Sequence, residues 1–587
     1  MDSFERFIVE NEGADTVRLV MSRREWPSPG DAGLAGLDAK SLAVNTIEGR
    51  KKLRKKLPEW VACSRLVYPS TLCTEQCSSS DTARYKASIV QRIFNEHGRP
   101  VASTLRQAQS TAGSPTEVTD FGTEEAGSLT EVAGSGTEET GSPTEAAGSG
   151  TEEAGSPTEV TGFGTEEAGS PTEVAGSGTE ETGSAACRDG LRISKLSVAS
   201  TVASTGSATK GTGSATKGTG SATKGTGSAT DCFLVTELAE VTEPKNGKVA
   251  DLTGGLGVDS WAFSKVAEEV LYNEMNPELA AAARHNFQAL GATNIFIRNC
   301  EATADSLEEI LGDFKPDVIF MDPARRDSVG KKVFLLEDCS PDVLKMLPQM
   351  FETSRFILLK ISPMADITMV VERLDRTYES FLDENHKGGW NGQWVREVHV
   401  VASCGECKEL LILLDREWRN RYSLTCREDG GTLTFTSEEI AGAKAVYPDS
   451  TFARIIFEPG KSLTKAGVFN AVCERFGLVK LARFTHLYTI GEPLSDSELE
   501  QRTAPLKDFG KVFYVKEILP LNKATMKDVG KRYPHSEVSA KNIPMSSDEL
   551  RVRLKVRSGD DAHIFGARIE TPYNEDNYLI VTEPTGR

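Results

Sequence analysis

The chain has 587 residues, of which 38% are hydrophobic and 26% are charged, and its formal net charge is −19. No run of about 18 apolar residues occurs, which argues against a membrane span. The first residues, MDSFERFIVENEGAD, are charged and lack an apolar signal region, so we expect a cytoplasmic protein.

The first predicted unit is a helical domain over residues 1–105. Apolar residues recur at helical spacing between Ser3 and Met21. A basic run follows from Arg50 to Lys56, with six basic residues in seven positions. Such a run is either a solvated helix face or a surface that contacts phosphates.

A low-complexity insert is predicted over residues 106–231. A 14-residue unit is repeated five times from Gly113, and a seven-residue unit, GSATKGT, is repeated from Gly206. Ordering one residue costs about 1–2 kcal/mol, which the few apolar side chains of these repeats cannot offset. We therefore expect a disordered insert. Residues 113–184 also hold 16 Asp and Glu and no Lys or Arg, so most of the net charge comes from this segment.

Residues 232–418 alternate between short apolar runs and helical stretches. Strands are predicted over 249–253, 269–273, 294–298, 317–321 and 355–361, and the intervening helices over 259–267, 277–290, 305–311, 334–351 and 366–374. Two further strands, 395–401 and 410–414, would close the sheet as a hairpin. This alternation predicts an α/β domain with a doubly wound, mostly parallel sheet.

Ligands of such sheets bind beyond the carboxyl ends of the strands. The first strand ends at Asp251, and the turn that follows holds Thr253, Gly254, Gly255 and Gly257. Glycines allow a backbone to approach a ligand closely, and amides at a helix start can hold an anionic group. Ser260 stands where a dinucleotide fingerprint needs its third glycine, which argues against a nicotinamide enzyme.

Acidic residues follow the next strands. Glu274 ends the second strand, where a carboxylate can accept both ribose hydroxyls of an adenosine ligand, although a surface acid before a helix is the alternative. Glu301 has the corresponding place on the third strand. The fourth strand ends in Asp322, Pro323, Ala324 and Arg325, which places a carboxylate beside the bound ligand.

Together these residues resemble motifs of class I S-adenosylmethionine (SAM)-dependent methyltransferases. More closely, the chain resembles bacterial methyltransferases of this class that carry a C-terminal THUMP-like domain. The resemblance covers residues 1–105 and 232–587 and includes the stretches 75–79 with 82–86, 251–259, 322–325, 360–364 and 406–410.

The resemblance implies a Rossmann-like domain that binds SAM as its cofactor. Cofactor-binding residues would be Asp251, Thr253, Gly254, Gly255, Gly257, Glu274, Met275, Glu301 and Ala302, with Glu274 at the ribose and Glu301 and Ala302 at the adenine. Asp322 and Pro323 would face the methyl acceptor. Arg325 replaces the aromatic residue of amino-methylating enzymes and would stack on a base or hold a phosphate. Lys360 would either act in catalysis or pair with a neighbouring acid.

Two other readings of these residues are less favoured. Pyrimidine C5 methylation needs a cysteine nucleophile, and none follows Lys360. Cys404 and Cys407 form a lone CxxC pair, whereas a structural zinc site needs four ligands, so no metal is predicted.

The resemblance further implies a ferredoxin-like domain over 419–503 and a THUMP-like domain over 504–587. Residues 507–557 carry 12 Lys and Arg against 6 Asp and Glu. Basic and apolar residues alternate from Arg551 to Arg557, which predicts a strand with one cationic face. We therefore expect methylation of structured RNA, either tRNA or rRNA. The alternatives are a protein or small-molecule acceptor, or an inactive RNA-binding protein.

Overall fold

The structure, a computed structural model, describes residues 2–22, 25–97, 246–325, 336–385, 393–429 and 431–584. The predicted low-complexity insert, 106–231, lies outside these residues. In the described ranges no helix combines the length and the apolar character that crossing a membrane requires.

The described part of the N-terminal region is helical, as predicted. Its helices are α1 (Ser3–Glu10), α2 (Thr16–Ser22), η1 (Ala32–Leu34), α3 (Ala39–Leu53), α4 (Pro58–Ala62), α5 (Thr71–Gln76) and α6 (Ser80–His97). The helical spacing between Ser3 and Met21 belongs to two helices, because α1 ends at Glu10 and the Asp15 side chain accepts from the amides of Val17 and Arg18 at the start of α2.

The central region forms a nine-stranded sheet in the order β11-β10-β8-β9-β7-β4-β1-β2-β3. Its strands are β1 (Lys248–Asp251), β2 (Glu269–Asn273), β3 (Ile295–Arg298), β4 (Val318–Met321), β7 (Phe356–Ile361), β8 (Val395–Ser403), β9 (Glu406–Asp415), β10 (Ser423–Glu428) and β11 (Gly431–Thr436). The five neighbouring strands β3, β2, β1, β4 and β7 are parallel, and β9 runs antiparallel to both β7 and β8. The predicted doubly wound sheet is therefore confirmed.

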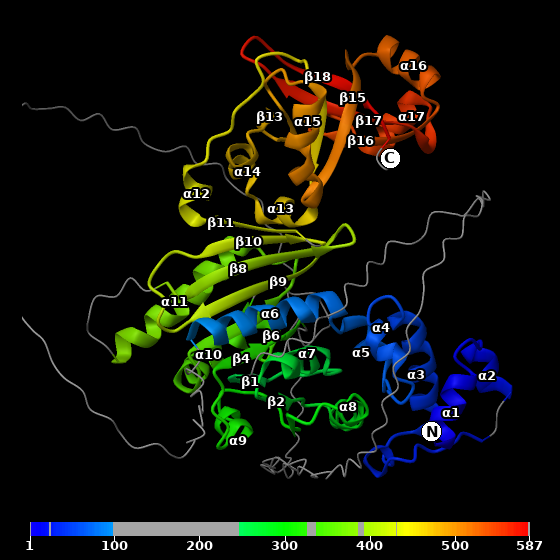
Figure 1. Ribbon diagram of the computed structural model, residues 1–587, viewed down its shortest axis with the longest axis vertical. Helices are drawn as coiled ribbons and strands as arrows, with labels where there is room; N and C mark the ends of the chain where they lie inside the picture. Colours follow the sequence, from blue (N-terminus) through cyan, green and yellow to red (C-terminus); the bar gives the residue numbers. More distant parts are fainter. Residues whose placement is uncertain are drawn as a thin grey trace, which may run out of the picture. The chain divides into compact units, whose positions relative to one another are not determined.

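Two helical layers cover this sheet (Figure 1). The helices are α7 (Val258–Val266), α8 (Pro277–Ala289), α9 (Leu307–Leu311), α10 (Val343–Thr353) and α11 (Ile367–Asn385). Alternate residues of each strand point to opposite faces, so Val318 and Phe320 join the core beneath α6, α7 and α8, while Ile319 and Met321 join the core beneath α9, α10 and α11.

Two predicted boundaries in the central region differ from the structure. The sheet does not end at residue 418, because β10 pairs with β8 in parallel and β11 pairs with β10. The helix predicted over 334–351 begins only at Val343, where the Asp342 side chain accepts from the Lys345 amide. Short segments precede it, namely η2 (Leu336–Asp338) and β6 (Cys339–Ser340), which pairs with β5 (Ala324–Arg325).

The C-terminal region forms a seven-stranded sheet in the order β13-β14-β12-β15-β18-β17-β16. Its strands are β12 (Ile455–Pro459), β13 (Val479–Ala482), β14 (Thr485–Thr489), β15 (Gly510–Pro520), β16 (His535–Lys541), β17 (Arg557–Glu570) and β18 (Glu575–Thr582). The helix α12 (Ser437–Gly442) precedes the first of these strands in the chain. The helices that follow are α13 (Lys461–Ala466), α14 (Phe469–Phe476), α15 (Asp496–Thr503), η3 (Ala504–Asp508), α16 (Lys523–Arg532) and α17 (Ser547–Leu554). Because β15 pairs with both β12 and β18, one sheet runs across the predicted boundary at residues 503 and 504.

The predicted cationic strand from Arg551 to Arg557 is wrong. This segment is the end of α17, which begins with a capping box between Ser546 and Glu549 and ends at Lys555 with a φ of 59°. The strand β17 starts only at Arg557. The capping box fixes a helix start that the alternation of basic and apolar residues conceals.

Candidate active site

The glycine turn after β1 is shaped by two aromatic rings. The Gly254 amide donates to the Asn273 carbonyl at 2.7 Å, and a Cβ at Gly254 would lie 2.1 Å from the Tyr272 ring. Gly257 starts α7 with a φ of 89°, and a Cβ there would lie 2.5 Å from the Phe287 ring. Side chains at these two positions would displace the turn from the sheet. At Gly255, in contrast, a Cβ would only approach the Thr253 carbonyl oxygen, at 3.9 Å, so this side of the turn is uncrowded.

Glu274 joins the end of β2 to this turn. One carboxylate oxygen accepts from the Gly255 amide at 2.8 Å, and the other accepts from the Asn276 amide at 2.8 Å. The carboxylate therefore lies beside the uncrowded Gly255. These two residues fit an adenosine ligand, because they offer acceptors for hydroxyl groups and a backbone that a ligand can approach.

The residues predicted to contact the adenine follow β2 and β3, and a side chain after β3 is hydrogen-bonded to the backbone after β2. Asn299 follows β3, and its side-chain amide donates to the carbonyls of Glu274 and Met275 at 2.6 and 3.1 Å. Met275 is 60% exposed, Ala302 is buried, and Glu301 is exposed. The Asn299 side chain thus ties the segment after β3 to the backbone at Glu274 and Met275, so the predicted adenine-side segment lies next to the end of β2.

Asp251 is buried at the end of β1. Its carboxylate accepts from the Ser260 hydroxyl at 2.5 Å and from the Thr253 amide at 3.2 Å. Burial raises the pKa of Asp251 to about 8, and the hydrogen bonds to Ser260 and Thr253 only partly oppose this shift. The Asp251 carboxyl group therefore holds its proton at a pH where exposed carboxyls have lost theirs.

The raised pKa of Asp251 predicts a pH-dependent contribution to stability. A carboxyl whose pKa is higher in the folded state stabilises the protein fully below about pH 4, and this contribution falls as the pH rises towards 8. Relative to Asp251→Asn, the wild type should lose up to about 1.4 kcal/mol per pH unit in that window. Chemical denaturation of both proteins between about pH 4 and pH 8 measures the difference. A difference that is constant with pH would contradict the assignment.

Asp322, at the end of β4, is held by two neighbours. Its amide donates to the Thr253 hydroxyl at 2.7 Å, which links β4 to the glycine turn. The Lys360 ammonium, on β7, donates to its carboxylate at 2.5 Å. Burial alone would lower the pKa of Lys360, but the carboxylates of Asp322, Glu409 and Asp259 outweigh burial and raise it. Lys360 is therefore a fixed cation beside Asp322, as one of the two predicted roles requires.

A buried network of charges continues from Lys360 to the N-terminal helices. Glu409, on β9, lies 4.0 Å from the Lys360 ammonium and accepts from Lys86 of α6 at 2.9 and 3.1 Å. Lys86 is fully buried and also contacts Asp259 of α7 at 3.2 Å and the Ser78 hydroxyl at 3.0 Å. Burial raises the pKa of Glu409, against the opposing effect of the two lysines.

The convergence of this network was not predicted. Ser78, Lys86, Asp259 and Glu409 lie in stretches that carry the sequence resemblance, but no role was given to them. No pattern singles out Lys86, because α6 mixes polar and apolar residues, and the weak signal at Glu409 is its place directly before the apolar run 410–414. The N-terminal helices therefore supply one charged side chain to the shell of groups behind Asp322.

The basic run from Arg50 to Lys56 is used inside the N-terminal region. Arg50 is buried and donates to the carbonyls of Val61 and Cys63. The other partners are Glu48 for Lys51, Glu75 for Lys52, Glu12 for Arg54, and the carbonyls of Thr74 and Glu75 for Lys56. Most cations of this run thus have partners within the N-terminal region, and the suggested phosphate surface stays a prediction.

Two further predictions concern Arg325 and metals. Pro323 is buried, and the Arg325 backbone pairs with Cys339 in the short β5–β6 ladder, whereas its side chain lies outside the described part. The stacking or phosphate role of Arg325 thus stays a prediction. Among the described residues, no group of three or more His, Cys, Asp or Glu side chains is arranged to hold a metal.

Comparisons with known proteins match the C-terminal region and the fold. Residues 456–496 match a family described as a ferredoxin-like domain, and residues 510–584 match a family described as THUMP domain-like. No curated protein matches the chain.

Solved structures include one similar over the whole length. A candidate methyltransferase from Porphyromonas gingivalis W83 is 21% identical with a TM-score of 0.59, and the match covers 100% of this chain and 98% of that one. A candidate methyltransferase from Streptococcus mutans, in complex with SAH, is 12% identical with a TM-score of 0.20 over 29% of this chain and 89% of that one. The predicted fold, and the resemblance to a methyltransferase fold with a C-terminal THUMP-like domain, are confirmed.

Proposed function

We propose that this chain, which joins a class I methyltransferase fold to a THUMP-like domain, is a SAM-dependent methyltransferase that modifies structured RNA. The observation that carries the proposal is the hydrogen-bonded set at the carboxyl edge of the sheet. Glu274 is bonded to the glycine turn, and the same turn is bonded to Asp322 through Thr253. A donor held by Glu274 would therefore lie next to Asp322.

The proposed roles follow from these positions. Glu274 and the Gly255 backbone would bind the ribose and the amino acid end of SAM, and Met275 and Ala302 would flank its adenine. When bound, SAM supplies a methyl group already activated on its sulfonium, so the protein mainly positions donor and acceptor. Asp322, oriented by Thr253 and Lys360, would accept a hydrogen bond or a proton from the methyl acceptor.

RNA as the acceptor is supported by the C-terminal region. The THUMP-like match covers residues 510–584. Within it, α16 exposes Lys523, Lys527 and Lys531, which lie four residues apart on one helix face. In the described part of the chain none of these three lysines forms an ion pair, so they are available to phosphates.

Glu274→Gln should weaken SAM binding by about tenfold or more, because a neutral amide replaces a carboxylate whose hydrogen bonds are worth roughly 1.5–3 kcal/mol each. The glutamine retains an oxygen that can accept from the Gly255 amide, so the turn should persist. Isothermal titration calorimetry with SAM measures the change. Glu278→Gln, an exposed residue of α8, is the control and should bind SAM as the wild type does. Equal affinity of both variants would contradict the role of Glu274.

A further inference from the structure

The ferredoxin-like region contains a hollow of about 470 Å³ that is separate from the candidate active site. It lies between the start of α14 and the strands β13 and β14. Its chemically distinctive lining residues are Phe469, Asn470, Lys480, Arg483, Phe484 and His486. None of the residues predicted to bind SAM or the methyl acceptor takes part in it.

Lys480 is a buried cation without a carboxylate partner. It is 4% exposed, and its ammonium donates to the Arg483 carbonyl at 2.7 Å and lies 5.5 Å from the centre of the Phe469 ring. Among the described residues, no carboxylate forms an ion pair with the Lys480 ammonium. Burial lowers the pKa of Lys480. An ammonium has three donors, and buried charges are normally paired, so this side chain lacks an anion.

Other groups of the hollow also suit an anion. Arg483 is exposed, and Val468, at the start of α14, provides no side-chain cap for this eight-residue helix. The first amides of α14 are therefore not satisfied by a capping side chain and lie at the positive end of the helix dipole. Together with Lys480, they provide cationic and donor groups around one space.

Aromatic rings border the same space. The His486 ring stacks on Phe469 with centroids 3.7 Å apart, and the His486 Nδ1 atom is buried without a hydrogen-bond partner among the described residues. Phe484 is 67% exposed, and the Arg483 guanidinium lies 5.2 Å from the centre of its ring. An exposed aromatic ring beside cations is the combination on which bases of single-stranded nucleic acids stack.

We propose that this hollow binds one nucleotide of a single-stranded RNA segment, with its phosphate at Lys480, Arg483 and the start of α14 and its base against Phe484. The proposal rests on the proposed function, since it assigns a second contact to the RNA substrate. It places that contact in the ferredoxin-like region, apart from the lysine face of α16.

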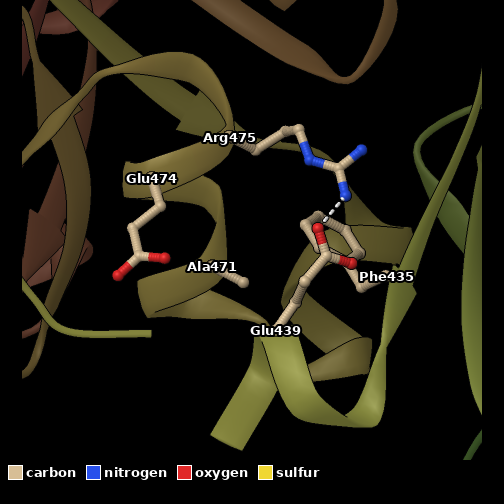
Figure 2. A pocket seen from close by; sticks show the side chains of 5 residues that line it. All are labelled: Phe435, Glu439, Ala471, Glu474 and Arg475. Carbon is tan, nitrogen blue, oxygen red and sulfur yellow. Dashed lines mark hydrogen bonds and ion pairs between the residues drawn. The ribbon is translucent and has the colours of Figure 1, made fainter. Parts of the chain in front are cut away.

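A neighbouring hollow of about 250 Å³ provides a matched control (Figure 2). Its arginine, Arg475, lies over the Phe435 ring but forms an ion pair with Glu439 at 2.5 Å, and Glu474 also lines the hollow. Here the cation already has its anion, and the two carboxylates disfavour a phosphate. Arg475→Gln therefore removes a similar charge from a site that should not bind RNA. Near the larger hollow Glu570 accepts from the Arg483 amide at 3.2 Å, but among the described residues it forms no ion pair with Lys480 or with the Arg483 guanidinium.

The test measures the affinity of the full chain for a fluorescein-labelled, single-stranded oligoribonucleotide of about 12 nucleotides by fluorescence anisotropy. We expect Lys480→Met and Arg483→Gln each to weaken binding about tenfold, and Arg483→Gln to lower the salt dependence by about one phosphate contact. Phe484→Ala should weaken binding severalfold, whereas Arg475→Gln should stay within about twofold of the wild type.

Two outcomes would overturn the proposal. If the wild type binds the oligoribonucleotide and neither Arg483→Gln nor Phe484→Ala weakens it, the hollow is not an RNA contact, while the proposed function stands. Both residues are exposed, so this result does not depend on whether Lys480→Met folds. If the wild type binds AMP in a manner sensitive to Arg483→Gln but does not bind the oligoribonucleotide, RNA is the wrong occupant of the hollow, while the proposed function, which rests on the THUMP-like region and the lysines of α16, stands.

Discussion

Lys86→Met should lower the free energy of unfolding by about 3–5 kcal/mol, because removing one partner of a buried ion pair leaves charge uncompensated in the interior. The variant would leave Glu409 and Asp259 without the cation that lies 2.9 and 3.2 Å from them. Chemical denaturation followed by tryptophan fluorescence measures the effect. Trp60 and Trp261 lie with their rings 6.1 Å apart, and so they report on the packing of the N-terminal helices against α7.

Lys52→Met is the matched control for this prediction. Lys52 pairs with Glu75 at 2.5 Å, but both side chains are largely exposed, at 42% and 57%. Exposed pairs contribute about 0–1 kcal/mol, so this variant should remain close to the wild type. Adding Glu409→Gln to Lys86→Met should restore part of the lost stability. Equal effects of the two lysine variants would show that the buried network does not hold the N-terminal helices on the sheet.

Asp322→Asn should lower kcat for methyl transfer by about 10²–10⁴-fold, the range typical of a lost general acid or base. Asparagine keeps the size of the side chain, and the backbone N–H of residue 322 keeps its hydrogen bond to the Thr253 hydroxyl. The neutral side-chain amide of asparagine, however, cannot take a proton. Single-turnover methyl transfer measures the chemical step, and SAM affinity should stay within about twofold. Retention of both kcat and SAM affinity would remove Asp322 from the reaction.

Asp317→Asn tests whether such an effect is specific. Asp317 lies just before β4, at the end of the strand opposite Asp322, where its carboxylate accepts from the Lys248 amide at 2.8 Å. The substitution changes the same residue type next to the same strand. It should leave the rate of methyl transfer unchanged, and a similar loss in both variants would indicate a general disturbance of β4.

The local features of the candidate site could be predicted from the sequence because they depend on neighbours in the chain. A glycine turn after a buried strand, and acids at the ends of the next strands, occupy positions that the parallel sheet itself brings to one edge. There Glu274 accepts from Gly255 of the turn, and the Asp322 amide donates to Thr253 of the same turn. Lys360, for which the sequence leaves two roles open, pairs with Asp322.

Long-range pairing could not be predicted in the same way. Lys86 and Glu409 are 323 residues apart, and nothing in either segment identifies the other as its partner. The partners of the basic run could not be predicted for the same reason, since Glu12 and Glu75, which pair with Arg54 and Lys52, lie elsewhere in the chain. A cluster of like charges in a sequence thus does not show whether its members remain free after folding.

The most direct test of the central claim is methyl transfer from labelled SAM to RNA. The full chain would be incubated with unmodified, transcribed tRNA and rRNA fragments, with Asp322→Asn as the control. We predict that label enters RNA with the wild type and not with the variant, and that the modified nucleotide can then be mapped. Absence of label from every RNA, in a protein shown to bind SAM, would contradict an RNA methyltransferase.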